Sequence, residues 1–352
     1  MSLSSDQLER YSRQLRFDGL GVTGQERLLA ARVAVLGCGA LGSVSAEILA
    51  RAGLGRLRLI DRDFVDYSNL PRQSLFDESD VAQVLPKVIA VSRKLARINS
   101  ACQIEPLITQ VSAANIQSLI ADVDLVIDGT DNFATRYLLN DAAVKHAQPW
   151  IFGSALAAHG MMLVVRPGLS PCLRCVLGDL PPPGAVPSCD QQGVLASTVH
   201  VVAALQCAEA LKFLSGNIKC LERRLVDFDL WAGTFNYRKI EKVRGRGHCR
   251  TCEQRRFDYL DAALEPPEVL AGRDGVQILP APGAAPPDLA RLLARAPADP
   301  RAAPGPNLVN EFLVRFSAEG CRFTVFDDGR AIIQGLTHLP TARRLYNDYV
   351  AI

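Results

Sequence analysis

Two Cys-x-x-C pairs, Cys172/Cys175 and Cys249/Cys252, are the residues of this 352-residue chain whose spacing most directly indicates chemistry. Each pair can place two sulfur atoms on one face of a tight turn. Two such turns, separated by a long insertion, suit a closed tetrahedral Zn²⁺ site with four thiolate ligands. A redox pair is the alternative, but it needs only one Cys-x-x-C beside a thioredoxin-like unit. The pairs therefore predict a structural zinc site that contributes to folding.

A glycine-rich turn near the N-terminus predicts a nucleotide site. An apolar run from Arg32 to Leu36 predicts a buried strand, and the turn Gly37-Cys-Gly-Ala-Leu-Gly42 leads into a small-residue helix that extends to about Arg51. The next apolar run ends at Asp61, close to the spacing at which a doubly wound sheet presents a carboxylate to a ribose hydroxyl. We expect the backbone of the turn to approach phosphate at the helix N-terminus, at Gly37, Gly39, Ala40 and Gly42. Taken alone, such a turn is most often that of an NAD-dependent oxidoreductase.

Polar side chains after the second strand favour ATP over NAD. Asp63 is followed by the segment Ser68-Asn-Leu-Pro-Arg-Gln73 and then by Lys87. An arginine and a lysine near a glycine turn suit a triphosphate better than a nicotinamide. In the alternative interpretation, Arg72 and Lys87 are solvated surface charges.

A third apolar run, residues 123–127, precedes the sequence Asp128-Gly-Thr-Asp131-Asn132. This order places an acidic residue at the carboxyl end of a strand, where open parallel sheets bind their ligands. Asp131 could hold Mg²⁺ there, since magnesium prefers carboxylate oxygens. Alternatively, Asp131 caps the helix that follows.

Several motifs follow one another along the chain in a fixed order: Tyr11-Ser-Arg13-Gln14, the turn 37–42, Asp61-x-Asp63, Ser68-Asn-Leu-x-Arg-Gln73, Pro86-Lys87, Thr130-Asp131-Asn132 and both Cys-x-x-C pairs. In these motifs the chain resembles the ThiF/MoeB/HesA family, which is related to the ubiquitin-activating enzymes, over residues 8 to about 255. The resemblance implies a Rossmann-like doubly wound α/β sheet of the ThiF/MoeB type with a structural zinc site. It also implies an enzyme that uses ATP to adenylylate the C-terminal Gly-Gly carboxylate of a ubiquitin-like sulfur carrier, with release of pyrophosphate, in thiamine, molybdopterin or related cofactor biosynthesis.

The resemblance also implies roles for individual residues. Asp61 and Asp63 fall on the ribose side and near the Mg²⁺ ion, and Asp131 falls on the ion itself. Arg13 would reach the phosphates bound by the neighbouring subunit, because the family completes its active site across a homodimer. The residues assigned to the phosphates are Asn69, Arg72, Gln73 and Lys87, and the other positions expected to line the nucleotide are Ser68, Thr130 and Asn132. Arg72→Ala and Lys87→Ala are expected to nearly abolish adenylylation and to leave the fold intact.

Cys189 lies in a proline- and glycine-rich stretch, residues 181–193, which predicts a mobile crossover loop with no regular helix or strand. The resemblance implies that a cysteine at this place can hold the activated carrier as a thioester or a persulfide-linked adduct. A spare cysteine on a loop is the alternative. The remaining cysteines are expected to be ordinary small apolar residues: Cys38, Cys102, Cys207, Cys220 and Cys321.

Composition limits the other functional classes. A hydrophobic content of 48% over 352 residues can build one large core and a small accessory domain. The formal net charge is only +2 with no basic block, which argues against nucleic acid as the main partner. The longest apolar stretch, residues 194–214, contains charged side chains and predicts a buried helix rather than a membrane span. With no signal peptide and with paired Cys-x-x-C motifs, the protein is expected to be cytoplasmic.

We expect an ATP-binding domain over residues 1–255, a linker over 256–275 and a small α+β domain over 276–352. In the last domain, apolar runs predict a strand at 276–279, a helix near 288–295, strands at 312–316, 321–326 and 331–334, and a final helix near 340–349. We find no reactive-cysteine loop of the rhodanese kind there. Two functional alternatives remain: adenylylation of another acceptor, such as a small molecule or a tRNA modification intermediate, and an NAD-dependent oxidoreductase.

Overall fold

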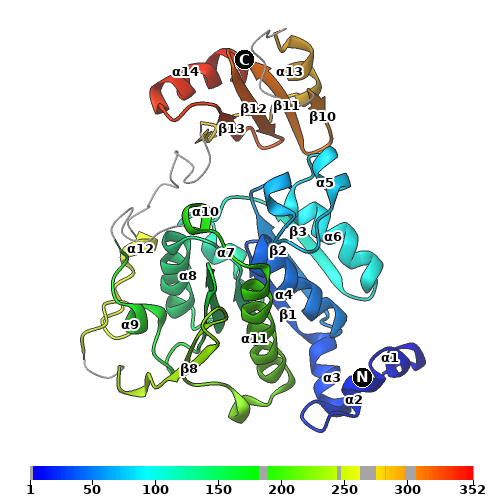
Figure 1. Cartoon of the computed structure of the whole chain (residues 1–352), viewed down its shortest axis with the longest axis vertical. Coiled ribbons are helices and arrows are strands. Elements are labelled where there is room, and N and C mark those ends of the chain that lie inside the picture. The colour runs from blue at the N-terminus through cyan, green and yellow to red at the C-terminus, as the bar shows by residue number, and fades with distance from the viewer. Residues whose placement is uncertain are drawn as a thin grey trace. The chain divides into compact units, whose positions relative to one another are not determined.

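The computed structural model describes residues 3–181, 189–243, 247–261, 275–281, 283–297 and 307–351. The chain divides into two compact units, Met1–Leu264 and Glu265–Ile352 (Figure 1). No helix within the described ranges is both long enough and apolar enough to cross a bilayer.

An eight-stranded mixed sheet forms the centre of the first unit, in the order β3-β2-β1-β4-β5-β6-β7-β8. The strands from β3 to β5 in this order pair in parallel, and β6, β7 and β8 continue the sheet in antiparallel pairs. The strand bounds are β1 Arg32–Leu36, β2 Arg56–Asp61, β3 Gln103–Ile108, β4 Leu125–Asp128, β5 Trp150–Leu156, β6 His159–Val165, β7 Leu225–Asp229 and β8 Thr234–Arg238.

Helices cover both faces of this sheet (Figure 1). Their bounds are α1 Ser5–Arg10, α2 Ser12–Leu15, α3 Gly21–Ala30, α4 Ala40–Arg51, α5 Glu78–Ala82, α6 Lys87–Ile98, α7 Ile116–Leu119, α8 Phe133–Lys145, α9 Leu173–Leu177, α10 Cys189–Gln192, α11 Ala196–Ser215 and α12 Asp258–Asp261. Three 3₁₀ turns add η1 Tyr67–Asn69, η2 Ile218–Cys220 and η3 Glu241–Val243.

Alternation along β1 shows how one strand serves two cores. Val33 and Val35 pack into the core that α3, α4, α6 and α11 cover, whereas Ala34 and Leu36 pack into the core of α7 and α8. Because successive side chains of a strand point to opposite faces, an uninterrupted apolar run is what a strand buried on both faces requires. The predicted doubly wound α/β fold is therefore confirmed, as are the strand at 32–36, the helix that ends at Arg51 and the buried helix within 194–214.

In its described residues, the second unit is a five-stranded antiparallel sheet in the order β10-β11-β12-β13-β9 with two helices. Its elements are β9 Gly275–Ile278, α13 Leu289–Arg295, β10 Leu308–Val309, β11 Leu313–Ala318, β12 Cys321–Phe326, β13 Ala331–Gln334 and α14 Leu339–Tyr349. Leu292 and Leu345 bring the two helices onto a core that includes Phe316 and Phe323 of the sheet. The small α+β architecture is confirmed. The two-residue strand β10 was not predicted, because a pair of residues carries no periodic signal.

Candidate functional site

Strand register places the ends of β1, β2 and β4 level with one another. Leu36 pairs with Ile60 on one side and with Asp128 on the other, so the residues that follow each strand emerge at the same edge of the sheet. Gly37 N–H donates to the carbonyl of Ile60 at 2.7 Å, and Gly129 N–H donates to the carbonyl of Leu36 at 2.8 Å. This edge is where the glycine turn, the Asp61 segment and the Asp131 segment meet.

Three glycines allow these segments to touch backbone to backbone. A Cβ atom at Gly42 would lie 1.7 Å from the carbonyl oxygen of Gly37, and one at Gly129 would lie 2.4 Å from the same oxygen. Gly37 itself has a φ of +83°, which side chains other than glycine rarely adopt. Gly129 was not among the predicted site residues. Its sequence signal was weak, because its function depends on a strand distant in the chain.

The N-terminus of α4 opens onto this edge. Gly39 is the N-cap and offers no side-chain oxygen to the first turn, so the N–H groups near Ala40 remain available to an external acceptor. A Cβ atom at Gly39 would have the amide of Gln73 as its nearest contact, at 3.6 Å. An uncapped helix start beside a glycine turn suits an anionic group such as phosphate.

The acidic residues after β2 are held by backbone donors and by a lysine. The two carboxylate oxygens of Asp61 accept from Cys38 N–H at 2.7 Å and from Asp63 N–H at 2.8 Å. Lys87 Nζ lies 3.3 Å from Asp63 Oδ2, and only 6% of the Lys87 side chain is exposed. Burial raises the pKa of Asp61, and the Lys87 ammonium opposes that rise. The structure thus gathers Asp61, Asp63 and Lys87, and Lys87 is not the solvated surface charge of the alternative interpretation.

The polar segment 68–73 is ordered by its own turn. Asn69 is buried and its side-chain oxygen accepts from Asp66 N–H at 3.1 Å, which closes the capping box of η1. Arg72 is half-buried and its Nη1 donates to the carbonyl of Ser68 at 2.6 Å. Gln73 is buried, and its Oε1 accepts no hydrogen bond from the described part of the chain. The segment therefore keeps the Gln73 amide beside the glycine turn.

The segment after β4 divides into buried and exposed residues. Thr130 is buried and its hydroxyl donates to Asp128 at 2.6 Å, whereas Asp131 is exposed. Asn132 is the N-cap of α8 and accepts from Thr135 N–H at 2.9 Å. The helix cap is therefore Asn132 and not Asp131, whose exposed carboxylate accepts from Asn132 Nδ2 at 3.4 Å. Arg13 lies exposed on α2, in the N-terminal part of the same unit.

Cys189 is the first residue of the one-turn helix α10. The expectation of a stretch without a regular helix is wrong at this point, because residues 189–192 contain no proline and Gly193, with a φ of +74°, follows the turn. Residues 182–188 of the same stretch lie outside the described residues.

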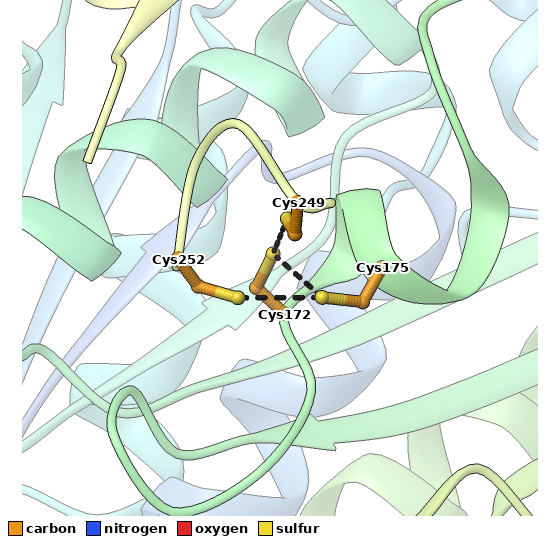
Figure 2. Close-up of side chains that lie close together, drawn as sticks. All are labelled: Cys172, Cys175, Cys249 and Cys252. Atoms are coloured by element: carbon orange, nitrogen blue, oxygen red, sulfur yellow. Dashed lines mark hydrogen bonds between the residues drawn. The ribbon is translucent and has the colours of Figure 1, made fainter. Parts of the chain in front are cut away.

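The four cysteines of the two Cys-x-x-C pairs converge from the start of α9 and from the turn at residues 249–252 (Figure 2). Their Sγ atoms all lie within 4.8 Å of one another, and no other group of three or more His, Cys, Asp or Glu ligands occurs in the ranges that the structure describes. Cys172 Sγ lies 3.8 Å from Cys175 Sγ and 3.6 Å from Cys249 Sγ, and Cys175 Sγ lies 3.3 Å from Cys252 Sγ. A Zn–S bond of about 2.3 Å puts tetrahedral sulfur atoms about 3.8 Å apart. The predicted cluster can therefore hold a metal ion.

Helix α8 anchors the cysteine loops. Asn140 Oδ1 accepts from Leu173 N–H at 2.9 Å, inside the first Cys-x-x-C turn, and Asp141 accepts from the Thr251 hydroxyl at 2.9 Å, inside the second. Arg174 is buried and donates to Asp258 at 2.9 Å. Burial raises the pKa of Asp141 to about 6. These contacts tie both turns to one helix.

The model of the ThiF family matches residues 11–251 of this chain. The chain belongs to the ThiF family. The ThiF-family chain is 38% identical over 351 residues to a protein of Bacillus subtilis (strain 168) named sulfur carrier protein ThiS adenylyltransferase. This match covers 97% of this chain and 99% of that protein. It is 41% identical over 254 residues to adenylyltransferase and sulfurtransferase MOCS3 of Sus scrofa, which covers 72% of this chain. That match spans 55% of MOCS3, so the chain accounts for about half of the length of that relative.

Among solved structures, the ThiF-family chain is similar to E. coli MccB crystallised with MccA-N7isoASN. The TM-score is 0.60 at 25% sequence identity, and the match covers 69% of this chain and 74% of the other. Free E. coli MccB gives a TM-score of 0.62 at 24% identity, covering 72% of this chain and 75% of that chain. These likenesses show that the ThiF fold extends over most of the chain.

Burial of the free cysteines generates a labelling prediction. Burial raises the pKa of Cys102 and of Cys207 to about 12, and it also raises the pKa of Cys38. Cys220 is exposed, so the expectation of an apolar role is wrong for this cysteine. Because the thiolate is the nucleophile, this rise makes the buried Cys102 and Cys207 thiols poorly reactive at pH 8. Iodoacetamide at pH 8 should modify Cys220 and spare the other three in the folded protein, as read by peptide mass spectrometry. Equal labelling of Cys207 and Cys220 without unfolding would contradict this burial.

Proposed function

We propose that this chain uses ATP to adenylylate the C-terminal Gly-Gly carboxylate of a ubiquitin-like sulfur carrier and releases pyrophosphate. The observation that carries the proposal is made at one edge of the sheet. In this ThiF-family chain, the glycines in backbone contact, Lys87 and Asp131 all lie at that edge. The near full-length match to a protein named sulfur carrier protein ThiS adenylyltransferase supports the same reaction.

The residues at the sheet edge fit ATP. The N–H groups at the uncapped start of α4 can bind phosphate, and Gly39 has no Cβ atom to keep phosphate away from the backbone. Lys87 and Arg72 supply positive charge nearby. The carrier carboxylate would attack the α-phosphate, the bond to pyrophosphate would break, and the product would be an acyl adenylate. This step needs no side-chain nucleophile. It needs fixed donors that neutralise charge on the phosphoryl oxygens and on the departing pyrophosphate.

The exposed carboxylate of Asp131 offers the oxygen donor that Mg²⁺ prefers, at the edge where the phosphates would lie. When bound there, Mg²⁺ would neutralise phosphate charge. Asp61 and Asp63 lie on the other side of the glycine turn, where Lys87 limits their net negative charge. We assign Asp131 to the metal, the Asp61 pair to the ribose side, and the segment 68–73 with Lys87 to the phosphates.

The four-cysteine cluster suits structural zinc. Four thiolates fill a tetrahedral coordination shell and leave no position for substrate. The adenylylation proposed at the sheet edge does not require this ion. Its role is to join the two cysteine turns, which are already tied to α8.

The match to the ThiS adenylyltransferase covers 97% of this chain, so it includes the second unit, whereas the MOCS3 match covers 72%. We therefore favour a ThiS-type carrier of thiamine biosynthesis over a molybdopterin carrier. We also propose a homodimer in which Arg13 of one subunit completes the nucleotide site of the other, since Arg13 is an exposed arginine that is free to reach across an interface.

ATP–pyrophosphate exchange with a panel of carriers tests the reaction. Exchange should depend on one carrier that ends in Gly-Gly and should vanish when the terminal glycine is removed. Arg72→Ala and Lys87→Ala should each lower the exchange rate by about three orders of magnitude, because charge on the phosphates is then left uncompensated. The matched control is Arg51→Ala, which removes an exposed arginine paired with Glu47 at the far end of α4 and should leave the rate unchanged.

Silence across the panel would contradict the carrier reaction, and exchange with a small acid alone would assign a different acceptor. Tight NADH binding without exchange would assign an oxidoreductase. Unchanged exchange in Lys87→Ala would refute the phosphate role of that lysine.

Mixing of two inactive variants tests the shared site. Arg13→Ala and Arg72→Ala should each be inactive alone, but a mixed dimer regains one site that holds both arginines. An equimolar mixture after subunit exchange should recover about a quarter of the wild-type rate. No recovery, with mixed dimers demonstrated by native mass spectrometry, would place Arg13 in the site of its own subunit or outside it.

Zinc removal tests the cysteine cluster. The purified protein should contain about one Zn²⁺ per chain, and a chelator should lower its melting temperature by at least about 10 °C, because metal binding is coupled to folding. Cys249→Ser should lose the metal, and Cys220→Ala should keep it. An identical melting curve with and without chelator would contradict a structural ion.

A further inference from the structure

A buried polar network lies beneath the segment that carries Asp131. Its members are Asp128 at 0% exposure, Arg136 at 4% and Gln206 at 0%, together with Thr130. Of these, only Thr130 was predicted as a site residue. Buried charges and amides are costly unless they are paired, so their arrangement indicates what they hold.

Arg136 joins three segments of the chain. Its Nε lies 3.1 Å from Asp128 Oδ2 at the end of β4, and its Nη2 donates to the carbonyl of Thr130 at 2.6 Å and to the carbonyl of Gly153 in β5 at 2.9 Å. The guanidinium carbon also lies 5.2 Å from the centre of the Phe152 ring. A planar guanidinium with these partners has one permitted orientation, and it fixes the Thr130 carbonyl relative to β5.

Asp128 completes the same arrangement. Its other carboxylate oxygen accepts from the Thr130 hydroxyl at 2.6 Å and from Thr130 N–H at 3.0 Å. Gln206 of α11 donates to the Asp128 carbonyl at 2.8 Å and to the Ile151 carbonyl at 3.1 Å. Burial raises the pKa of Asp128, and the Arg136 charge opposes that rise. The N–H, hydroxyl and carbonyl of Thr130 are all bonded to this pair, directly before the exposed Asp131.

Net stability does not by itself explain this ion pair, because the cost of removing both charges from water offsets much of their attraction. What the pair provides is a fixed position for Thr130, the residue that precedes Asp131. We propose that Arg136 is a positioning residue that acts through Asp128 and Thr130 to fix the Asp131 carboxylate against the glycine turn. This inference rests on the proposed function, because it takes Asp131 as the residue that meets magnesium-bound ATP.

Equilibrium binding of α,β-methylene-ATP, an analogue that cannot be cleaved between the α- and β-phosphates, tests the proposal without turnover. The measured quantity is the ratio of the Kd in EDTA to the Kd in Mg²⁺, determined by calorimetry. Loss of a residue that orients a metal ligand typically costs 10–100-fold in affinity. Arg136→Gln should therefore lower this ratio by about 10–100-fold relative to wild type, with a smaller change in the Kd in EDTA.

Two further variants separate positioning from general destabilisation. Arg174→Gln removes a second buried arginine that pairs with a carboxylate, beside the four cysteines, and should lower the melting temperature without changing the ratio. Arg136→Lys keeps the charge but loses the planar fork, so its ratio should lie between those of wild type and Arg136→Gln. If Arg136→Gln does not fold, Arg136→Lys carries the comparison.

A wild-type ratio in Arg136→Gln, or an equal fall in Arg174→Gln and Arg136→Gln, would overturn the positioning role. Absence of Mg²⁺-dependent nucleotide binding in the wild-type protein would instead refute the proposed function. The two failures are therefore distinguishable in one set of titrations.

Discussion

Backbone contact between Gly37, Gly42 and Gly129 is the constraint on which the rest of the site depends. The carbonyl oxygen of Gly37 occupies the space that a Cβ atom would fill at either of the other two glycines. The contact brings the start of α4 and the end of β4 close together, and it leaves no room for a Cβ atom at Gly42 or Gly129. Groups on the two segments can therefore contact the same small ligand, because neither segment has a side chain at these glycines.

The polar residues around this contact hold backbone more than they hold one another. Asp61 accepts from the N–H groups of Cys38 and Asp63, and Arg136 donates to the carbonyls of Thr130 and Gly153. Hydrogen bonds from charged groups to backbone are stronger than neutral ones, and in a buried setting their loss is expensive. The loops at the sheet edge are consequently rigid supports for the residues that remain exposed, Asp131 among them.

Helix α8 links the sheet edge at Asp131 with the two Cys-x-x-C turns. Its N-cap is Asn132, next to Asp131, and two turns later Asn140 and Asp141 bind the two cysteine loops. A metal ion bound by the four cysteines would therefore also stabilise the part of α8 that carries Asn140 and Asp141.

The sequence alone determined the elements and the local chemistry of this protein. Apolar runs located β1 and β4, the glycine turn located the start of α4, and the spacing of Cys172/Cys175 and Cys249/Cys252 indicated a shared ion, because each of these signals lies within a few neighbouring residues. Tertiary structure decided the contacts of Gly129, Arg136 and Asn132, the exposure of Cys220 and the short strand β10. Those depend on which residue of β4 lies beside Leu36 of β1 and on which side chains then face a buried carbonyl. Such pairings join distant parts of the chain, and the pattern within one strand does not say which residue of a distant parallel strand will lie beside it.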